Sequence, residues 1–578
     1  KKIGMYRFAG MAVMAAIASA TDKFSIDAAT RTFRDELGRS RIFHGFNVVV
    51  KASPYIPIED HFDFDMSISD EDIQHLQDWG AKIVRLGVMW ESVEREPGVY
   101  DTEYLDKVDA LINKLGDAGI AVIVDNHQDL FSRQLCGEGV PQFYTPKDID
   151  HHCPIGLVGT FFRLAGRCVS LKSYNMETDE QGLPLISECQ KHSFEDMYTA
   201  PEVASSFDAL YSNKDGLLDK MFAFWTEVAS RFKNNPNVIG YDILNEPWPA
   251  NMYKEASLFF KPRKFDKERL FPVAQRAHDV VREVDDKKAI FFEGAQFPDT
   301  QPFFGGKTLS LGFPDTPGGA EYANRQVLND HSYCCQAAGK MCDEGEPPLE
   351  KSDTCRKFHL QKVMKRAEDA ENYGVPLMFT EFGACFDGER CATEITNSAD
   401  AFDAGLSSWA YWQYKSFGDF TTTGGTKEGM FNADGTPQEA KLRAVARTYA
   451  HAFQGAPENM FFQTANGSFK TSWGLEKAVQ GLTEVYMNED LFYRDGYKLT
   501  LTNSANDLIP FRATSEIKNY MQIGLTQMDD LQEGESVKLN LTPKMPSATF
   551  SGSNDENGFR MSYTVTEQET NSSMCRFQ

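Results

Sequence analysis

Two glutamates, far apart in the chain, each follow a short apolar run of the β-strand type. Residues 238–244 lead into Asn245-Glu246-Pro247, and residues 377–380 lead into Glu381-Phe382-Gly383. Hydrolysis of a glycoside requires two carboxyl groups, of which one protonates the departing oxygen while the other attacks the anomeric carbon or stabilises its charge. Carboxyl groups about 5–5.5 Å apart give retention of configuration through a glycosyl-enzyme intermediate. These residue types therefore predict glycosidase chemistry, provided that Glu246 and Glu381 meet in one cleft.

The runs that end in these glutamates belong to a series of β-type segments that alternate with helical patterns. The segments are residues 43–51, 82–90, 120–127, 238–246, 289–294, 328–333, 376–383 and 408–414. Apolar stripes at helical spacing lie between them, for example in residues 104–115 and 217–232. This alternation is typical of βαβ units, and the number of units predicts a (β/α)₈ TIM barrel of the α/β class. In such a barrel the polar residues at strand ends meet at the carboxyl-terminal face.

The chain, with 578 residues, is too long for one compact core, so we expect two folded units. We assign residues 21–455 to the barrel, which closes with a predicted helix at about residues 439–452. From residue 469 to residue 563, short alternating runs separated by Asn, Asp and Gly predict an antiparallel β-sandwich. We assign residues 456–578 to this smaller unit and its frayed tail. The long stretch between residues 127 and 207 predicts an elaborated loop over one face of the barrel.

The first twenty residues have the pattern of a signal peptide. Lys1, Lys2 and Arg7 precede an apolar run over residues 8–18, and Ala18-Ser19-Ala20 offers a cleavage site of small residues. A buried N-terminal helix or an uncleaved anchor is the alternative. Secretion also fits three N-glycosylation sequons, at Asn466, Asn540 and Asn571. We expect a secreted glycoprotein that acts outside the cell or in a lysosomal or vesicular compartment.

The cysteines point to the same kind of compartment. There are 11 of them, bunched in residues 136–189 and 334–391 with Cys575 apart, and we expect them to form disulfides whose connectivity the sequence does not fix. The adjacent Cys334-Cys335 predict a strained loop or a disulfide beside Tyr333. There is no pair of Cys-x-x-Cys steps, and His151-His152-Cys153 lacks a second half. We therefore expect no metal site and no cofactor.

The charge and hydropathy exclude two classes of partner. The formal net charge is −25, whereas nucleic-acid binding relies on clustered Lys and Arg, so we expect no nucleic-acid partner. After the leader, no stretch approaches the roughly 20 consecutive apolar residues that a membrane helix requires. We expect contact with lipid, if any, to be transient and at the surface of a membrane or micelle.

The motif Asn245-Glu246-Pro247 after the fourth β-type run resembles the acid/base motif of glycoside hydrolase family 5 and its wider clan. The similarity continues along the barrel, where further residues fall in the order and at the strand ends expected for that family: Arg85, His127, His331-Ser332-Tyr333, Glu381 and Trp412. A narrower part of the sequence resembles endoglycoceramidases and the related glucosylceramidases and steryl glucosidases. This likeness is carried by residues 33–39, 43–51, 125–133 and 241–249, and by the appended β-sandwich.

The resemblance implies the positions of the catalytic groups, and physical chemistry suggests their roles. Glu246 is the expected acid/base, with a pKa raised by partial desolvation and by the negative charge of Glu381. Glu381 is the expected nucleophile. Arg85 and Tyr333 are placed to keep it ionised by charge and hydrogen bonding, His331 belongs to the same network, and Tyr333 also contacts the substrate.

The same resemblance implies residues that bind the sugar. Asn245 is expected to donate to the 2-hydroxyl, a contact that strengthens as the oxocarbenium-like state develops. Trp412 offers an apolar face on which a sugar ring can stack. Lys51, His127 and Asp129 are expected to bind outer hydroxyls of the same sugar.

The expected reaction is cleavage between the oligosaccharide and the ceramide of a glycosphingolipid. Simple glucosyl or galactosyl ceramides, steryl glucosides and β-glucans remain alternative substrates, and a barrel that binds glycolipid without turnover remains an alternative of another class. A ceramide needs an apolar channel, because each methylene group taken out of water gains about 0.8 kcal/mol. Candidate wall segments are Phe259-Phe260, Phe303-Phe304 and Met460-Phe461-Phe462.

Overall fold

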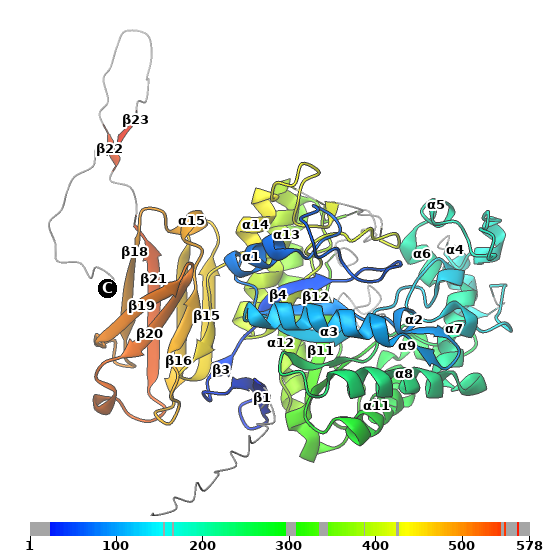
Figure 1. Ribbon diagram of the computed structural model, residues 1–578, viewed down its shortest axis with the longest axis horizontal. Coiled ribbons are helices and arrows are strands. Elements are labelled where there is room, and N and C mark those ends of the chain that lie inside the picture. The colour runs from blue at the N-terminus through cyan, green and yellow to red at the C-terminus, as the bar shows by residue number, and fades with distance from the viewer. Residues whose placement is uncertain are drawn as a thin grey trace, which may run out of the picture.

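The computed structural model describes most of the chain (Figure 1). The described residues are 23–153, 156–164, 167–295, 308–334, 345–386, 388–422, 427–544, 548–550 and 563–565. The leader expected at residues 1–20 lies outside them. Among the helices in these ranges, none combines the length and the apolar character needed to cross a membrane.

A closed barrel of parallel strands forms the centre of the molecule, as predicted. Its strands in chain order are β4 (His44–Val48), β5 (Ile83–Gly87), β8 (Ala121–Asp125), β9 (Val238–Asp242), β10 (Ala289–Glu293), β11 (Gln326–Ser332), β12 (Leu377–Phe382) and β13 (Ser408–Tyr411). Each lies within or overlaps one of the eight β-type runs of the sequence, and β13 pairs with β4 to close the barrel. Strands buried on both faces read as nearly continuous apolar runs, which explains why the prediction succeeded.

Helices pack around the barrel on its outer side. They are α1 (Asp70–Asp78), α3 (Thr102–Asp117), α8 (Leu217–Phe232), α11 (Phe271–Val284), α12 (Ser352–Tyr373), α13 (Gly388–Ala404) and α14 (Glu439–Val445). Local signals set their ends: Ser69 and Asp72 form a capping box at the start of α1, and Gly374, with φ of 70°, ends α12. The apolar stripes of α3 and α8 face the strands, because both helices bury the residues that recur at helical spacing.

The loops after β8 and β9 are long and lie at the carboxyl-terminal end of the barrel. The first contains α4 (Leu157–Leu164), α5 (Ile186–Cys189), α6 (Phe194–Tyr198) and α7 (Pro201–Tyr211), and the second contains α9 (Ala256–Phe260) and α10 (Pro262–Phe265). The disulfides Cys136–Cys189 and Cys153–Cys168 close the first loop on itself. The elaborated loop predicted between residues 127 and 207 is therefore confirmed.

Two more disulfides lie where barrel strands end. Cys334–Cys355 joins the segment after β11 to α12, and Cys385–Cys391 closes the loop between β12 and α13. The disulfide expected beside Tyr333 is thus present, through Cys334. Covalent links at these points restrict the strand ends that carry His331, Tyr333 and Glu381.

Two antiparallel sheets form a second unit at the end of the molecule opposite helices α4–α6 (Figure 1). One sheet contains β1 (Phe24–Asp27), β2 (Thr32–Asp35), β3 (Ser40–Arg41), β14 (Tyr449–Phe453), β17 (Thr483–Tyr486), β20 (Tyr520–Leu525) and β19 (Phe511–Ile517). The other contains β15 (Gly455–Gln463), β16 (Ser468–Leu475), β21 (Ser536–Pro543) and β18 (Tyr497–Thr502). Their facing side chains share one apolar core, which includes Trp473, Val485, Ile523 and Leu539. The predicted sandwich is confirmed.

The structure differs from the prediction at the edges of the sandwich. The helix expected at residues 439–452 ends at Val445, and β14 begins at Tyr449, because this segment pairs with β17 and with β3. The N-terminal strands β1–β3, assigned from sequence to the barrel unit, join the sandwich sheet instead through the pairing of Phe453 with Ser40. Pairing between residues so far apart in sequence leaves no local signal.

One expectation about the lipid channel is wrong. Met460 and Phe462 lie in the sandwich core, and Phe461 between them is exposed, as strand alternation along β15 requires. This segment therefore packs the sandwich and does not line a channel at the barrel end. Phe303-Phe304 lies outside the described residues.

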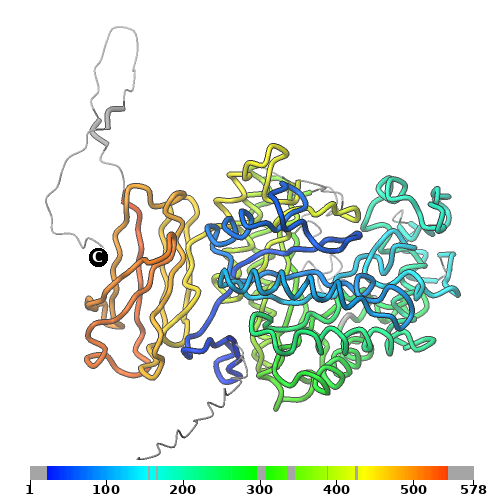
Figure 2. The backbone as a smooth tube through the Cα atoms, in the orientation of Figure 1, coloured from blue at the N-terminus to red at the C-terminus, as the bar shows by residue number. Residues whose placement is uncertain are grey.

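Aromatic and charged side chains fix the sandwich against the amino-terminal side of the barrel. The ring of His44 is stacked between Trp409 and Tyr449, with ring centroids 4.0 and 3.6 Å away. Tyr449 Oη donates to the carbonyl of Gly80 at 2.8 Å, and Arg447 pairs with Asp403 at 2.8 Å. The chain path in Figure 2 shows the N-terminal strands, in blue, beside this junction. The sandwich thus leaves the carboxyl-terminal mouth of the barrel uncovered.

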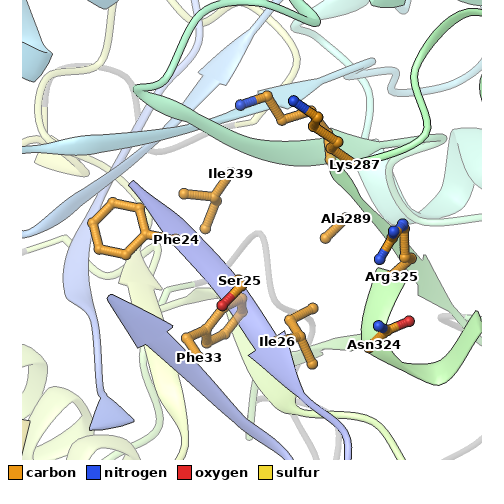
Figure 3. Close-up of a pocket in the computed structure, with 10 residues that line it drawn as sticks. Phe24, Ser25, Ile26, Phe33, Ile239, Lys287, Ala289, Asn324 and Arg325 are labelled. Atoms are coloured by element: carbon orange, nitrogen blue, oxygen red, sulfur yellow. The ribbon is translucent and has the colours of Figure 1, made fainter. Parts of the chain in front are cut away.

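A cavity of about 200 Å³ lies at the amino-terminal end of the barrel, between the β1–β2 hairpin and strands β9 and β10 (Figure 3). Phe24, Phe33 and Ile239 contribute to its apolar lining, and Lys287 and Arg325 approach it from the barrel side. The chemistry of such barrels occurs at the opposite end, where the two glutamates are found. This cavity is therefore not the candidate active site.

Candidate active site

Glu246 and Glu381 lie side by side at the carboxyl-terminal mouth of the barrel. Glu381 is in β12, and Glu246 follows β9 by four residues. An oxygen of each carboxyl group and a ring nitrogen of His331 all lie within 4.8 Å of one another. This separation is shorter than the roughly 6.5–9.5 Å of an inverting pair and fits the retaining geometry.

Two hydrogen-bond donors hold the carboxyl group of Glu381. Tyr333 Oη donates to Oε1 at 2.7 Å, and Arg85 Nη1 donates to Oε2 at 3.3 Å. Burial raises the pKa of Glu381 above its ordinary value, while the charge of Arg85 opposes the rise. Donors on both oxygens fix the carboxyl plane in one orientation.

Arg85 is the centre of a buried network that reaches the other predicted residues. Its Nε donates to Asp242 at 2.9 Å, and its Nη2 donates to Asp125 at 2.9 Å and to Asn245 Oδ1 at 2.8 Å. Burial alone would lower the pKa of Arg85, but the charges of the surrounding carboxylates raise it, so the guanidinium stays charged. Arg85 therefore orients both the carboxyl group of Glu381 and the side-chain amide of Asn245, which precedes Glu246.

Glu246 has an unusual backbone conformation. Its φ of 42° lies in the left-handed region, which costs a residue other than glycine about 1–3 kcal/mol. Gln128 Nε2 supports this turn by donating to the carbonyls of Asn245 and Glu246, at 2.8 and 3.3 Å. The turn directs the side chain of Glu246 toward His331, whose Nδ1 lies 2.8 Å from Oε1.

The electrostatic environment of Glu246 suits a general acid. Burial raises its pKa to about 7, and the nearby charge of Asp129 adds to the rise. Desolvation and the charge of Glu381 were the two predicted causes of the raised pKa of Glu246. Desolvation is the larger cause, but the leading charged neighbour is Asp129 and not Glu381. A carboxyl group with this pKa still carries its proton in much of the population near neutral pH.

His331 bridges the two glutamates. Its Nδ1 is 2.8 Å from Glu246 Oε1 and 3.7 Å from Glu381 Oε1, and its side chain is fully buried. Burial lowers the pKa of His331 to about 4, so the imidazole is neutral at physiological pH. His331 therefore acts on the pair through hydrogen bonding, and not as a fixed positive charge.

Four of the residues predicted to bind sugar, Lys51, His127, Asp129 and Trp412, form one cluster. The ring of His127 is stacked on the indole with centroids 5.0 Å apart, and Lys51 Nζ lies 5.0 Å from the indole centroid. Lys51 pairs with Asp129 Oδ2 at 2.7 Å. Burial alone would lower the pKa of His127, but hydrogen bonds to Asp125 and Asp129 raise it to about 9. The cluster thus holds two cations beside the Trp412 ring.

Several polar residues of this cluster had no recognisable sequence signal. Lys51 Nζ also lies 2.9 Å from Asp419 and 3.4 Å from Glu138, and Trp412 Nε1 donates to Glu428 at 3.0 Å. Burial raises the pKa of Glu428 to about 8, with the charge of Asp419 adding to the rise. All three carboxylates come from loops, where periodicity gives no guidance. Glu293 is different, because it ends β10 and a strand-end acid was a signal that could have found it.

Within the described ranges, three groups bring potential metal ligands within 4.8 Å of one another. Cys334 of the first, with His359 and Glu394, is bonded to Cys355 and offers no thiolate. The second, His127, Asp129 and Glu138, surrounds the ammonium of Lys51, which occupies the place of a cation. The third is the pair Glu246 and Glu381 with His331. The first group is thus part of a disulfide, the second holds the Lys51 ammonium, and the third is the candidate catalytic pair with His331.

Comparison with known proteins gives matches to both units. A protein-family model described as cellulase, glycosyl hydrolase family 5, matches residues 54–418. A second, described as glycoside hydrolase family 5 C-terminal domain, matches residues 447–539.

Similar proteins cover nearly the same length. An endoglycoceramidase of Cyanea nozakii is 31% identical over 479 residues, which are 82% of this chain and 86% of that protein. An endoglycoceramidase of Hydra vulgaris is 30% identical, with coverage of 82% and 83%. Among solved structures, endo-glycoceramidase II from Rhodococcus sp. in complex with ganglioside GM3 has a TM-score of 0.64 at 20% identity, covering 89% of this chain and 99% of that one. This structural likeness establishes the shared fold.

Proposed function

The chain belongs to glycosyl hydrolase family 5, and from that membership we propose that it is an endoglycoceramidase, which releases the intact oligosaccharide of a glycosphingolipid from ceramide. The observation that carries the proposal is the pair Glu246 and Glu381, with carboxyl oxygens within 4.8 Å at the barrel mouth. The length of the likeness to two endoglycoceramidases supports this substrate class. By contrast, a glucosylceramidase of Rhizopus delemar matches only 19% of the chain.

In the proposed first step, Glu381 attacks the anomeric carbon while Glu246 transfers its proton to the glycosidic oxygen. The bond between sugar and ceramide breaks, ceramide leaves as the neutral alcohol, and the oligosaccharide is held as an ester of Glu381. Arg85 and Tyr333 orient the attacking carboxylate, through their contacts at 3.3 and 2.7 Å.

In the second step, the ionised Glu246 removes a proton from water, and the resulting hydroxyl attacks the anomeric carbon. The ester bond to Glu381 breaks, the oligosaccharide leaves with its β configuration, and both glutamates return to their starting protonation states. We further propose that Asn245, His127, Asp129, Lys51 and Trp412 bind the sugar next to the scissile bond.

The test of this function is product analysis with a ganglioside in detergent. We expect intact oligosaccharide and ceramide as the first products. Stepwise loss of single sugars, or cleavage of glucosylceramide alone, would assign another substrate. Binding without any product from glycosphingolipids, steryl glucosides or β-glucans would identify a barrel that binds glycolipid without turnover.

We also propose that the protein is secreted. The four disulfides of the described residues suit an oxidising compartment. Asn466, the first residue of a sequon, is exposed in the turn between β15 and β16, where a glycan can be attached without displacing a packed side chain.

The pH dependence of kcat/KM follows from the two glutamates. Glu246 must carry its proton at the start, so activity should fall as pH rises above about 7, the value to which burial raises its pKa. Glu381 must be ionised, so activity should also fall as pH drops through its own pKa, which burial raises above the ordinary value. A pH–rate profile with a soluble aryl glycoside measures both limbs. Activity that still rises above pH 8 would contradict the assignment.

Replacing Tyr333 with Phe removes one donor from Glu381 and little volume. A hydrogen bond to a charged group contributes about 1.5–3 kcal/mol, so we expect kcat/KM to fall by about 10- to 100-fold. Because this bond favours the ionised carboxyl group, its loss should also move the acidic limb of the pH profile to higher pH. Tyr373→Phe is the matched control, since Tyr373 Oη donates to the carbonyl of Phe313 outside the active site. Equal profiles for the two variants would remove Tyr333 from the network.

A further inference from the structure

An exposed apolar face lies on the long loop after β8. In α4, Leu157, Phe161 and Leu164 follow helical spacing, and their exposed fractions are 74%, 38% and 85%. Phe260 in the neighbouring helix α9 is 41% exposed, and α4 and α9 are in contact. Large aliphatic side chains with this much exposure on one helix face are unusual in a protein surrounded only by water.

The helix is fixed in this position and is not an unattached segment. Its inner face is buried through Val158 and Phe162, and the Phe162 ring packs edge-on against Tyr253 with centroids 6.1 Å apart. The disulfide Cys153–Cys168 closes the loop that carries it. A helix that is apolar on both faces, with one face already packed on the protein, presents the other face outward.

Cationic side chains lie close in the sequence to the residues of the apolar face. Between residues 153 and 176 the chain has neither Asp nor Glu, although the net charge of the protein is −25. Arg163 and Lys172 of this segment are exposed, whereas Arg167 pairs with Glu195 and Asp196 of α6 at 3.9 and 3.6 Å. Lys261 and Arg263, which follow Phe260, are exposed as well, and within the described part of the chain they have no ion-pair partner. Apolar side chains among cations are typical of segments that lie in the interface of a bilayer with anionic lipids.

The face is at the catalytic end of the molecule. The loops after β8 and β9 both leave the carboxyl ends of barrel strands, and Figure 1 shows α4 with α5 and α6 at the end away from the sandwich. Tyr253, which contacts α4, follows Glu246 by seven residues. A bilayer against α4 would therefore lie on the side from which a membrane substrate enters.

We propose that Leu157, Phe161, Leu164 and Phe260, together with the exposed cations Arg163, Lys172, Lys261 and Arg263, form a docking surface for a lipid bilayer that carries anionic lipid. The proposal rests on the proposed function, since a glycosphingolipid is itself anchored in a bilayer by its alkyl chains. Docking brings the barrel mouth to the headgroups and raises the local concentration of substrate. The attraction between cations and anionic lipid is weakened by salt.

The test uses the double variant Leu157→Gln/Leu164→Gln and co-sedimentation with vesicles of phosphatidylcholine, phosphatidylserine and a ganglioside. Loss of two inserted leucines should reduce the vesicle partition coefficient by about tenfold or more. Hydrolysis of vesicle-borne ganglioside should fall in parallel, while kcat/KM on a soluble aryl glycoside should change less than about twofold. The matched control is Leu508→Gln/Ile517→Gln, which alters residues that are 77% and 65% exposed on the sandwich, and it should bind vesicles like the wild type.

A second variant, Lys261→Glu/Arg263→Glu, changes only exposed charges and should weaken binding most at low salt. The proposal is overturned if the Leu157→Gln/Leu164→Gln and Lys261→Glu/Arg263→Glu variants both bind vesicles like the wild type. It is also overturned if the wild type is a dimer that the Leu157→Gln/Leu164→Gln change dissociates. Co-sedimentation measures vesicle binding and does not require that the protein cleave any substrate. A wild type that binds vesicles through this face but cleaves no glycosphingolipid in detergent would therefore refute the proposed function and leave the docking surface intact.

Discussion

Replacing Glu381 with Gln is expected to lower kcat on every substrate by about 10⁴-fold or more, while glycolipid binding persists. The amide of Gln has nearly the same size as the carboxyl group but is a poor nucleophile, so the glycosyl ester cannot form. Because the loss occurs before the aglycone leaves, even an aryl glycoside with a good leaving group should not rescue the rate. Steady-state kinetics and calorimetric titration with glycolipid in detergent measure the two effects separately.

The control for this variant is Glu389→Gln, which removes a carboxylate from an exposed position on α13. It should retain wild-type rates. A second control uses Glu381→Gly with azide, which occupies the vacated space and attacks the anomeric carbon once, giving a glycosyl azide of inverted configuration. Substantial turnover by Glu381→Gln without azide would show that another group is the nucleophile.

Replacing Glu246 with Ala is expected to have an effect that depends on the leaving group. Ceramide is a poor leaving group and needs a proton, so its release should slow by about 10²- to 10⁴-fold, the usual contribution of general acid catalysis. An acidic phenol leaves without a proton, so formation of the glycosyl ester from an aryl glycoside should be nearly unaffected. The alkaline limb near pH 7 should disappear from the profile, because the group that titrates there is gone.

Azide again provides the check. With Glu246→Ala it attacks the glycosyl ester in place of activated water, so it should accelerate turnover and give a glycosyl azide of retained configuration. The two variants therefore produce azides of opposite configuration if the roles are assigned correctly. The same decrease for ceramide and phenol leaving groups would contradict the role of Glu246 as acid.

The fold and the central pair could be predicted because both depend on local patterns. Buried parallel strands give apolar runs, and barrel topology brings the carboxyl ends of the strands to one mouth, so Glu246 and Glu381 were expected at the same mouth. The contacts within the cluster of Lys51, His127, Asp129 and Trp412 could not be predicted. Glu138, Asp419 and Glu428 reach Lys51 and Trp412 from loops whose conformation depends on disulfides and tertiary packing.

The same reasoning explains the errors at the sandwich. The apolar residues Met460 and Phe462 alternate along a strand, but the sequence does not say which sheet they cover, and they pack the sandwich core. Strands β1–β3 join that sheet through Ser40 and Phe453, a pairing across most of the chain. Phe260, also considered for a channel wall, is exposed beside α4, and the exposure of Leu157 and Leu164 became visible only in three dimensions.

The most direct test of the double displacement is to trap its covalent intermediate. A 2-deoxy-2-fluoro β-glycoside with a good leaving group reacts with the nucleophile, and the fluorine then slows release of the ester by destabilising the oxocarbenium-like transition state. Mass spectrometry of a protease digest should find one glycosyl group on the peptide that contains Glu381. A label on Glu246, or no label together with a first product of inverted configuration, would contradict the account.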